Sequence, residues 1–277
     1  MNAYADVTTI ASANYLDIES TRLDDLKTGL RKILEACSRE IDSYVDRAFF
    51  CWEGVRYYDG AGKFFKFDDD ILSITTFKLD EDGDGTFEST LDAEDYVLYP
   101  LNAYPKEYAK PSAQGDYGSF ASNIPKGVEI DGVFGYGDGR SATPYKDSGD
   151  EVEDNPLAAD ATVVTVNDAD NFGAGQTIRM EDEQAYIEDV NTSTEKLTVR
   201  RGVNGTTAAA HVQNTTIYIY EYPADIVEVC LIESVRAASA GNWLEVSGNP
   251  ETVVFSVKKG FHPKSVESLD RFLKMGW

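Results

Sequence analysis

Cysteine, histidine and cationic residues are scarce in this chain of 277 residues, and each shortage argues against a class of protein. The three cysteines, Cys37, Cys51 and Cys230, include no Cys-x-x-Cys pair, so we expect neither a disulfide framework nor a zinc site. The two histidines, His211 and His262, lie far apart in the sequence, and we expect both to be solvent-exposed or to cap a helix.

Positive charge is the second shortage. The chain has 25 Lys and Arg against 49 Asp and Glu, which gives a formal net charge of −24. A protein that binds nucleic-acid phosphates normally carries the opposite sign. The composition therefore favours a soluble, self-repelling surface, or a surface that does not hold DNA.

Long apolar runs and catalytic motifs are also missing. No stretch of about 18 apolar residues occurs, so no membrane span is predicted. The first residues, "MNAYADVTTI", lack the basic and apolar regions of a signal peptide. The sequence contains no Gly-x-Ser-x-Gly elbow, no His-Glu-x-x-His and no phosphate-binding loop. We therefore expect a protein that is not an enzyme and that needs no cofactor.

Two helices are predicted from apolar residues at three- and four-residue steps, over 21–46 and over 224–240. Because neither helix can bury its apolar stripe alone, we expect the two helices to pack together. The residues expected in the core between them are Leu26, Leu30, Ile33, Cys37, Ile41, Ile226, Val229 and Cys230. A strand, "ETVVFSVKKG", and a short terminal helix are predicted after them.

Strand signals fill the remaining chain. Residues up to 137 predict a small sheet packed on the first helix, with a long loop between Pro100 and Pro125. Residues 141–156 are polar and acidic, which is typical of a linker, and short strands over 157–221 predict an inserted barrel-like β-module. The expected fold class is α+β, with a discontinuous helical core domain from 1–140 and 222–277, a small β-sheet and the inserted all-β module.

An acidic motif, "KLDEDGDGTFEST", spans residues 78–90 and begins like an EF-hand calcium loop. The twelfth loop position is Leu91 instead of the bidentate Glu, and the flanking residues predict strands instead of helices. These differences favour an acidic hairpin turn. A structural calcium ion stays open as an alternative, with the ligands Asp80, Asp82, Asp84 and Glu88.

The two chain ends together resemble the head-to-tail connector (adaptor) proteins of long-tailed bacteriophages. The first predicted helix ends in a phrase similar to that family's, with Ile41, Asp42, Tyr44, Arg47 and Phe49. The segments "RYYDGAGKFFKFDDDILSITTFKLDEDGDGTFE" and "VEIDGVFGYG" resemble the strands that follow. The second helix has a similar Pro-x-x-Ile start, at Pro223 and Ile226. Residues 157–221 depart from the family pattern.

The resemblance implies a structural virion protein at the portal vertex. Such proteins form a homo-oligomeric ring, usually of twelve copies, between the portal protein and a tail-completion or stopper protein. Double-stranded DNA passes through the ring without sequence-specific binding. The implied location is the neck of the virion, after synthesis in the host cytoplasm, with no membrane. By analogy with the family's C-terminal segment, Phe272, Met275 and Trp277 are expected to contact the portal.

A function of a different class comes from the 157–221 module. Tyr186, Tyr218 and Tyr220 could present stacking faces to a sugar, which would make the chain a carbohydrate- or surface-binding protein. The same tyrosines could instead fill the core of the barrel, and the sequence leaves both alternatives open.

Overall fold

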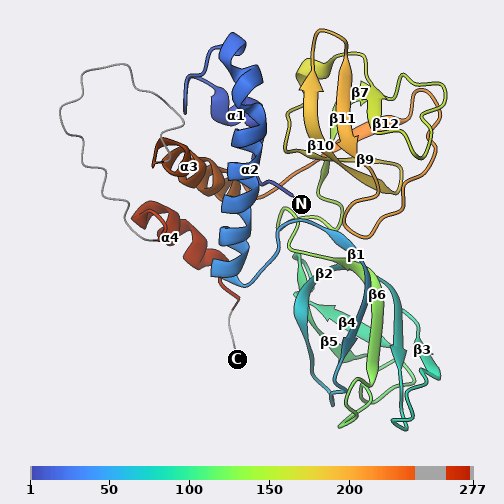
Figure 1. The fold of residues 1–277 in the computed structure, drawn as a ribbon. Coiled ribbons are helices and arrows are strands. Elements are labelled where there is room, and N and C mark those ends of the chain that lie inside the picture. The colour runs from blue at the N-terminus through green and yellow to red at the C-terminus, as the bar shows by residue number, and fades with distance from the viewer. Residues whose placement is uncertain (1, 241–259, 275–277) are drawn as a thin grey trace. The chain divides into compact units, whose positions relative to one another are not determined.

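The computed structural model describes residues 2–240 and 260–274, and its described part is mostly β-structure (Figure 1). Two antiparallel sheets of six strands each account for most of the regular structure. The expected fold class, α+β with a helical core from both chain ends, is therefore wrong. The chain forms two compact units, one of residues 1–46, 145–203 and 207–277, and one of residues 47–144 and 204–206.

The unit of residues 47–144 is built around the first sheet. Its strands are β1 (Trp52–Tyr58), β2 (Phe65–Leu79), β3 (Ser89–Leu91), β4 (Tyr96–Tyr99), β5 (Lys106–Pro111) and β6 (Val128–Phe134). The order across the sheet is β1-β6-β2-β5-β4, with β3 paired to β2, so β1 and β4 form its two ends. Strand β5 lies within the stretch that was expected to be a long loop.

Aromatic side chains explain why this sheet folds as a unit of its own. Phe65, Phe67, Phe77, Phe120 and Phe134 are buried in one hydrophobic cluster. The rings of Phe77 and Phe120 stack with their centroids 5.3 Å apart. Burial of large aromatic groups is the main stabilising contribution in a small sheet. The sheet was expected to pack on the first helix; it belongs instead to a compact unit that does not include that helix and has a core of its own.

The second sheet belongs to the other unit. Its strands are β7 (Tyr145–Glu151), β8 (Val163–Thr165), β9 (Thr177–Met180), β10 (Glu183–Asn191), β11 (Lys196–Arg200) and β12 (Thr216–Tyr220), with the short helix η1 (Ala169–Asn171). The order is β7-β12-β9-β10-β11-β8. The strands expected over 157–221 are present, and the range expected to be a linker contains β7, an edge strand of the same sheet.

The same unit contains the helices α1 (Val7–Ala11), α2 (Ser20–Val45), α3 (Ala224–Ala240) and α4 (Pro263–Leu269), followed by η2 (Asp270–Phe272). Helices α2 and α3 pack against each other, with Ser38 Oγ 3.5 Å from Cys230 Sγ. Six of the eight residues expected between them are buried, namely Leu30, Cys37, Ile41, Ile226, Val229 and Cys230, and Leu26 and Ile33 are half-buried. None of the helices in the described ranges has the length and apolar character needed to cross a membrane.

Helix α2 is also bonded directly to the second sheet. The Tyr186 hydroxyl on β10 donates to Glu35 Oε1 at 2.8 Å, and Lys27 Nζ lies 2.6 Å from Asp189 Oδ1. The chain before α1 adds a further bond, because Thr177 Oγ1 lies 2.9 Å from Asn2 Oδ1. The β-module and the helices therefore share one compact unit, whereas the sequence predicted a module inserted beside the helical core.

Candidate functional site

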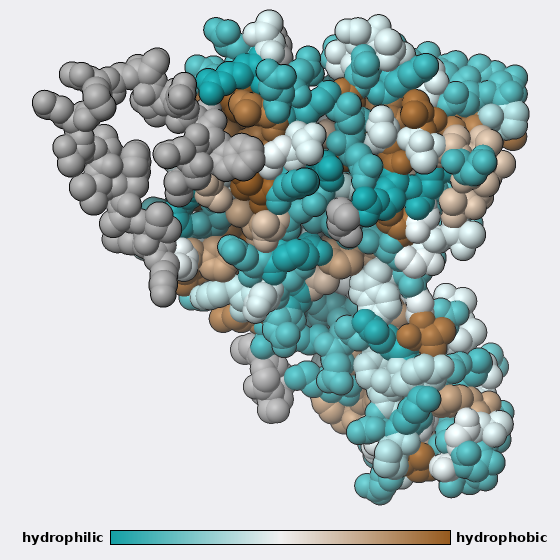
Figure 2. Space-filling view, in the orientation of Figure 1, coloured by the Kyte–Doolittle hydropathy of each residue, from teal (hydrophilic) through white to brown (hydrophobic). Residues whose placement is uncertain are grey.

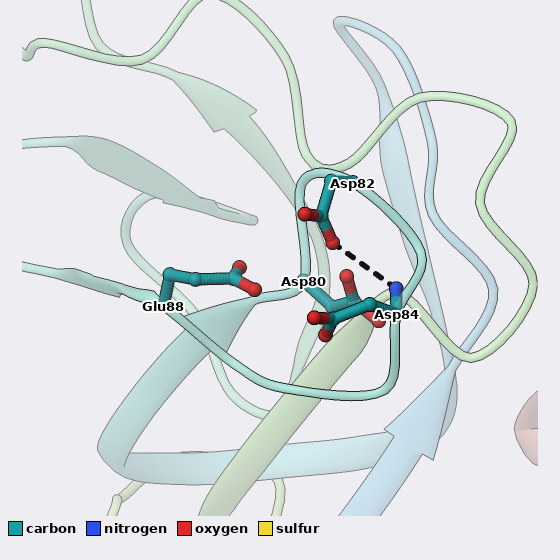
Figure 3. Close-up of side chains that lie close together, drawn as sticks. All are labelled: Asp80, Asp82, Asp84 and Glu88. Atoms are coloured by element: carbon teal, nitrogen blue, oxygen red, sulfur yellow. Dashed lines mark hydrogen bonds between the residues drawn. The ribbon is translucent and has the colours of Figure 1, made fainter.

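The acidic motif forms a tight turn between β2 and β3. One carboxylate oxygen from each of Asp80, Asp82, Asp84 and Glu88 lies within 4.8 Å of the others, so the four predicted metal ligands do meet. Figure 3 shows Glu88 extending toward the three aspartates from the β3 side of the loop. Asp80 is buried and the other three are exposed.

Backbone groups of the turn already use these carboxylates. Asp80 accepts hydrogen bonds from the N–H groups of Gly83 (2.6 Å) and Gly85 (2.9 Å), and both glycines have positive φ. Asp82 accepts from the N–H of Asp84 at 3.1 Å (Figure 3). A calcium ion takes six to eight oxygen ligands. The turn therefore has a complete explanation as an acidic hairpin, and the same four carboxylates supply part of a calcium ligand set.

Asp42, from the family-like phrase, is held near the N-terminal segment. It accepts a hydrogen bond from the buried Tyr4 hydroxyl, and Arg39 Nη2 lies 3.1 Å from Asp42 Oδ2. Burial raises the pKa of Asp42 to about 6, although Arg39 and the Tyr4 hydroxyl act in the opposite direction. This part of the phrase therefore fixes the chain before α1 to α2.

Tyr44 and Arg47 make further contacts within their own units. The Tyr44 hydroxyl donates to Asp270 Oδ1 at 2.8 Å, which joins the end of α2 to the segment after α4. Arg47 Nη1 lies 3.3 Å from Asp70, and its Nη2 lies 3.0 Å from Glu107. Phe49 is fully buried. Each residue of the phrase thus has a structural contact that accounts for its side-chain type.

A buried ionic network on the second sheet was missed by the sequence analysis. Glu183 forms a bidentate pair with Arg201, at 2.5 and 2.7 Å, and both side chains are almost inaccessible. His211 Nε2 lies 2.9 Å from Glu183, and its Nδ1 lies 2.8 Å from Glu181. Burial alone would raise the pKa of Glu183, but Arg201, the Ala209 N–H and His211 outweigh it, and the pKa is lowered.

The network fixes the loop between β11 and β12. Arg201 also donates to the carbonyls of Ala158 and Ala161, in one turn, and of Ala209, so that one guanidinium joins two separate stretches of backbone. The expectation of an exposed or capping histidine is therefore wrong for His211. It is right for His262, which accepts a hydrogen bond from the Lys264 N–H at the start of α4.

The C-terminal segment is described as far as residue 274. Phe272 is half-buried in η2, Leu273 is 41 % exposed, and the Lys274 N–H donates to the Val45 carbonyl at 3.1 Å. The other two residues of the expected portal contact, Met275 and Trp277, lie outside the described residues.

The three tyrosines of the sugar-binding alternative have different surroundings. Tyr186 and Tyr220 are buried, and the Tyr186 hydroxyl is used by Glu35. Tyr218 is 38 % exposed. A sugar-binding platform needs several accessible ring faces, and only one of these three side chains offers one.

Comparison with known proteins finds no relative whose site could be compared with this one. No family model, no curated protein and no solved structure matches the chain.

Proposed function

We propose that the chain is a structural protein of a phage head-to-tail connector, whose copies form a ring between the portal and the tail. The observation that carries the proposal is the pairing of α2 with α3. These helices hold Ile41, Asp42 and Tyr44 of the first family-like phrase and Ile226 of the second, and they are more than a hundred residues apart in the sequence. Their packing brings together two of the segments that carry the resemblance.

The charge of the chain supports the same proposal. With 49 acidic against 25 basic residues in each copy, a ring would carry an excess of negative charge, which disfavours tight binding of the phosphates of passing DNA. Hydrophilic residues cover most of the face drawn in Figure 2, and the apolar residues on that face form small, separate patches. Such a surface suits a channel along which DNA slides without being held.

The partners follow from the proposal. The ring binds the portal protein on one side and a tail-completion or stopper protein on the other, in the neck of the virion, after synthesis in the host cytoplasm. Phe272, Met275 and Trp277 are the proposed portal contact. The protein is proposed to have no catalytic activity and to need no cofactor for assembly.

Mass measurement of the full chain, alone and mixed with the portal protein of the same phage, tests the proposal. We expect a defined multi-subunit species, either alone or once the portal is present. A chain lacking residues 275–277 should bind the portal more weakly while its thermal unfolding stays unchanged. A protein that stays monomeric at high concentration and does not bind the portal would contradict the proposed function.

A further inference from the structure

Strand β1 has an open edge. Its seven residues pair with β6 in an unbroken antiparallel register, and β1 is the end strand of the sheet. The Glu53 N–H points away from β6 and donates to the carbonyl of Asn204, which belongs to the same unit. Because the backbone N–H and C=O groups of successive residues point to opposite edges of a strand, those of Val55 and Tyr57 also point away from β6. Among the described residues they have no hydrogen-bond partner.

Two of the accessible side chains along this strand are apolar. Val55 is 44 % exposed and Tyr57 is 48 % exposed. Proteins normally protect such edges with short strands, charges, bulges or proline. Strands β3 and β8 have three residues each, and β7 has an irregular register and two aspartates. Strand β1 has neither a bulge nor a proline, and its exposed Arg56 is paired with Asp69 of the same unit at 3.2 Å. A partner strand can therefore add to it beside Val55 and Tyr57.

The opposite end of the same sheet offers a second open edge. Strand β4 consists of four large, β-favouring residues, "YVLY", and all four pair with β5 on one side. On the edge of β4 that faces away from β5, the backbone groups of Tyr96–Tyr99 have no hydrogen-bond partner among the described residues. Each copy of the chain therefore has unpaired backbone groups at both ends of one sheet, at Val55 and Tyr57 of β1 and along the outer edge of β4.

We propose that β1 of one copy pairs with β4 of a second copy, so that the sheets of neighbouring subunits are joined edge to edge. Two different edges that meet head to tail make a heterologous interface, and such an interface closes into a ring when the rotation between copies allows it. Main-chain hydrogen bonds supply the affinity in this mode of association. The inference rests on the proposed ring and names the surfaces that join its subunits.

Disulfide cross-linking of the full-length chain tests the pairing. The three native cysteines are buried, so cysteines introduced at the edges are the ones that react. Val55→Cys combined with either Val97→Cys or Leu98→Cys, which sample both faces of β4, should give a ladder of covalent oligomers on a non-reducing gel. Each single variant should give no ladder.

Three other outcomes of the cross-linking and mass measurements would separate a wrong interface from a wrong function. Dimers from Val55→Cys alone would show that β1 pairs with itself in a two-fold arrangement, which overturns the inference. A wild-type ring without cross-links in either double variant would put the subunit contact elsewhere and leave the proposed function standing. A wild-type chain that is monomeric with and without the portal would remove the proposed function itself.

A backbone variant gives an independent measurement. Val55→Pro removes an N–H that points away from β6, so the strand can keep its pairing within the subunit. We expect the variant to unfold at the temperature of the wild type and to lose its oligomers in mass measurement. Val55→Thr keeps the N–H and should assemble normally. Normal assembly of a folded Val55→Pro variant would overturn the inference.

Discussion

Replacing Glu183 by Gln removes the centre of the buried network on the second sheet. The carboxylate of Glu183 accepts two hydrogen bonds from Arg201 and contacts His211 Nε2. It also accepts hydrogen bonds from the backbone N–H groups of Gly202 (3.1 Å) and Ala209 (2.9 Å). A glutamine has the same shape but only one accepting oxygen. Its amide group would face at least two of these donors.

The magnitude follows from the burial of the partners. Glu183 and Arg201 side chains are 1 % and 5 % exposed, so the variant leaves a guanidinium charge without its carboxylate inside the protein. Breaking a buried ion pair in this way costs about 3–5 kcal/mol. Two buried donors without acceptors, at about 1–3 kcal/mol each, give a similar figure.

Urea unfolding at neutral pH, followed by circular dichroism, measures the loss of stability. Hydrogen exchange of residues 202–211 shows whether the loop opens. Glu181→Gln is the matched control, because Glu181 is 60 % exposed and contacts the other nitrogen of the same histidine. Its effect should stay below about 1 kcal/mol. If Glu183→Gln also costs less than about 1 kcal/mol and exchange in the loop is unchanged, the network does not stabilise the fold.

Three further predictions concern Asp42, Asp80 and Ile41, which lie outside this network. Because the pKa of Asp42 is raised to about 6, the folded protein binds the extra proton, and stability should fall as pH rises from about 4 to 6. Asp42→Asn should flatten this part of the pH profile by up to about 3 kcal/mol, measured by urea unfolding at each pH. Asp80→Ala should cost about 1–3 kcal/mol equally with EDTA and with Ca²⁺, because its oxygens accept backbone N–H groups; a cost seen only with Ca²⁺ would make Asp80 a metal ligand instead. Ile41→Ala, at a fully buried site on α2, should lower the free energy of unfolding by about 2–5 kcal/mol, whereas Ser43→Ala on the exposed face should have little effect.

Local pattern was sufficient for the long elements. The apolar stripes of α2 and α3 predicted both helices and the faces that pack together, because a period near 3.6 residues leaves one interpretation over 15 or more residues. The acidic turn was predicted because Asp and Gly residues form turns through bonds that span only a few positions.

Strands β5 and β7 were missed for the opposite reason. "KEYAKP" and "YKDSGDE" have no alternating apolar pattern, and each becomes a strand because a partner, β4 and β2 for the first and β12 for the second, supplies its hydrogen bonds. His211 was misjudged in the same way. Its carboxylate partners lie 28 and 30 positions earlier in the chain, a separation that no local pattern records.

The sequence by itself determined the two long helices, most of the strands, the acidic turn and the charge of this protein, because propensity, periodicity and composition act within a few neighbouring residues. Only the tertiary structure decided that the aromatic residues of 47–144 form a core of their own, that the second sheet is bonded to α2, and that β1 and β4 are left as open edges. Each of these outcomes depends on which distant surfaces bury one another, and that choice is made by the free energy of the whole fold.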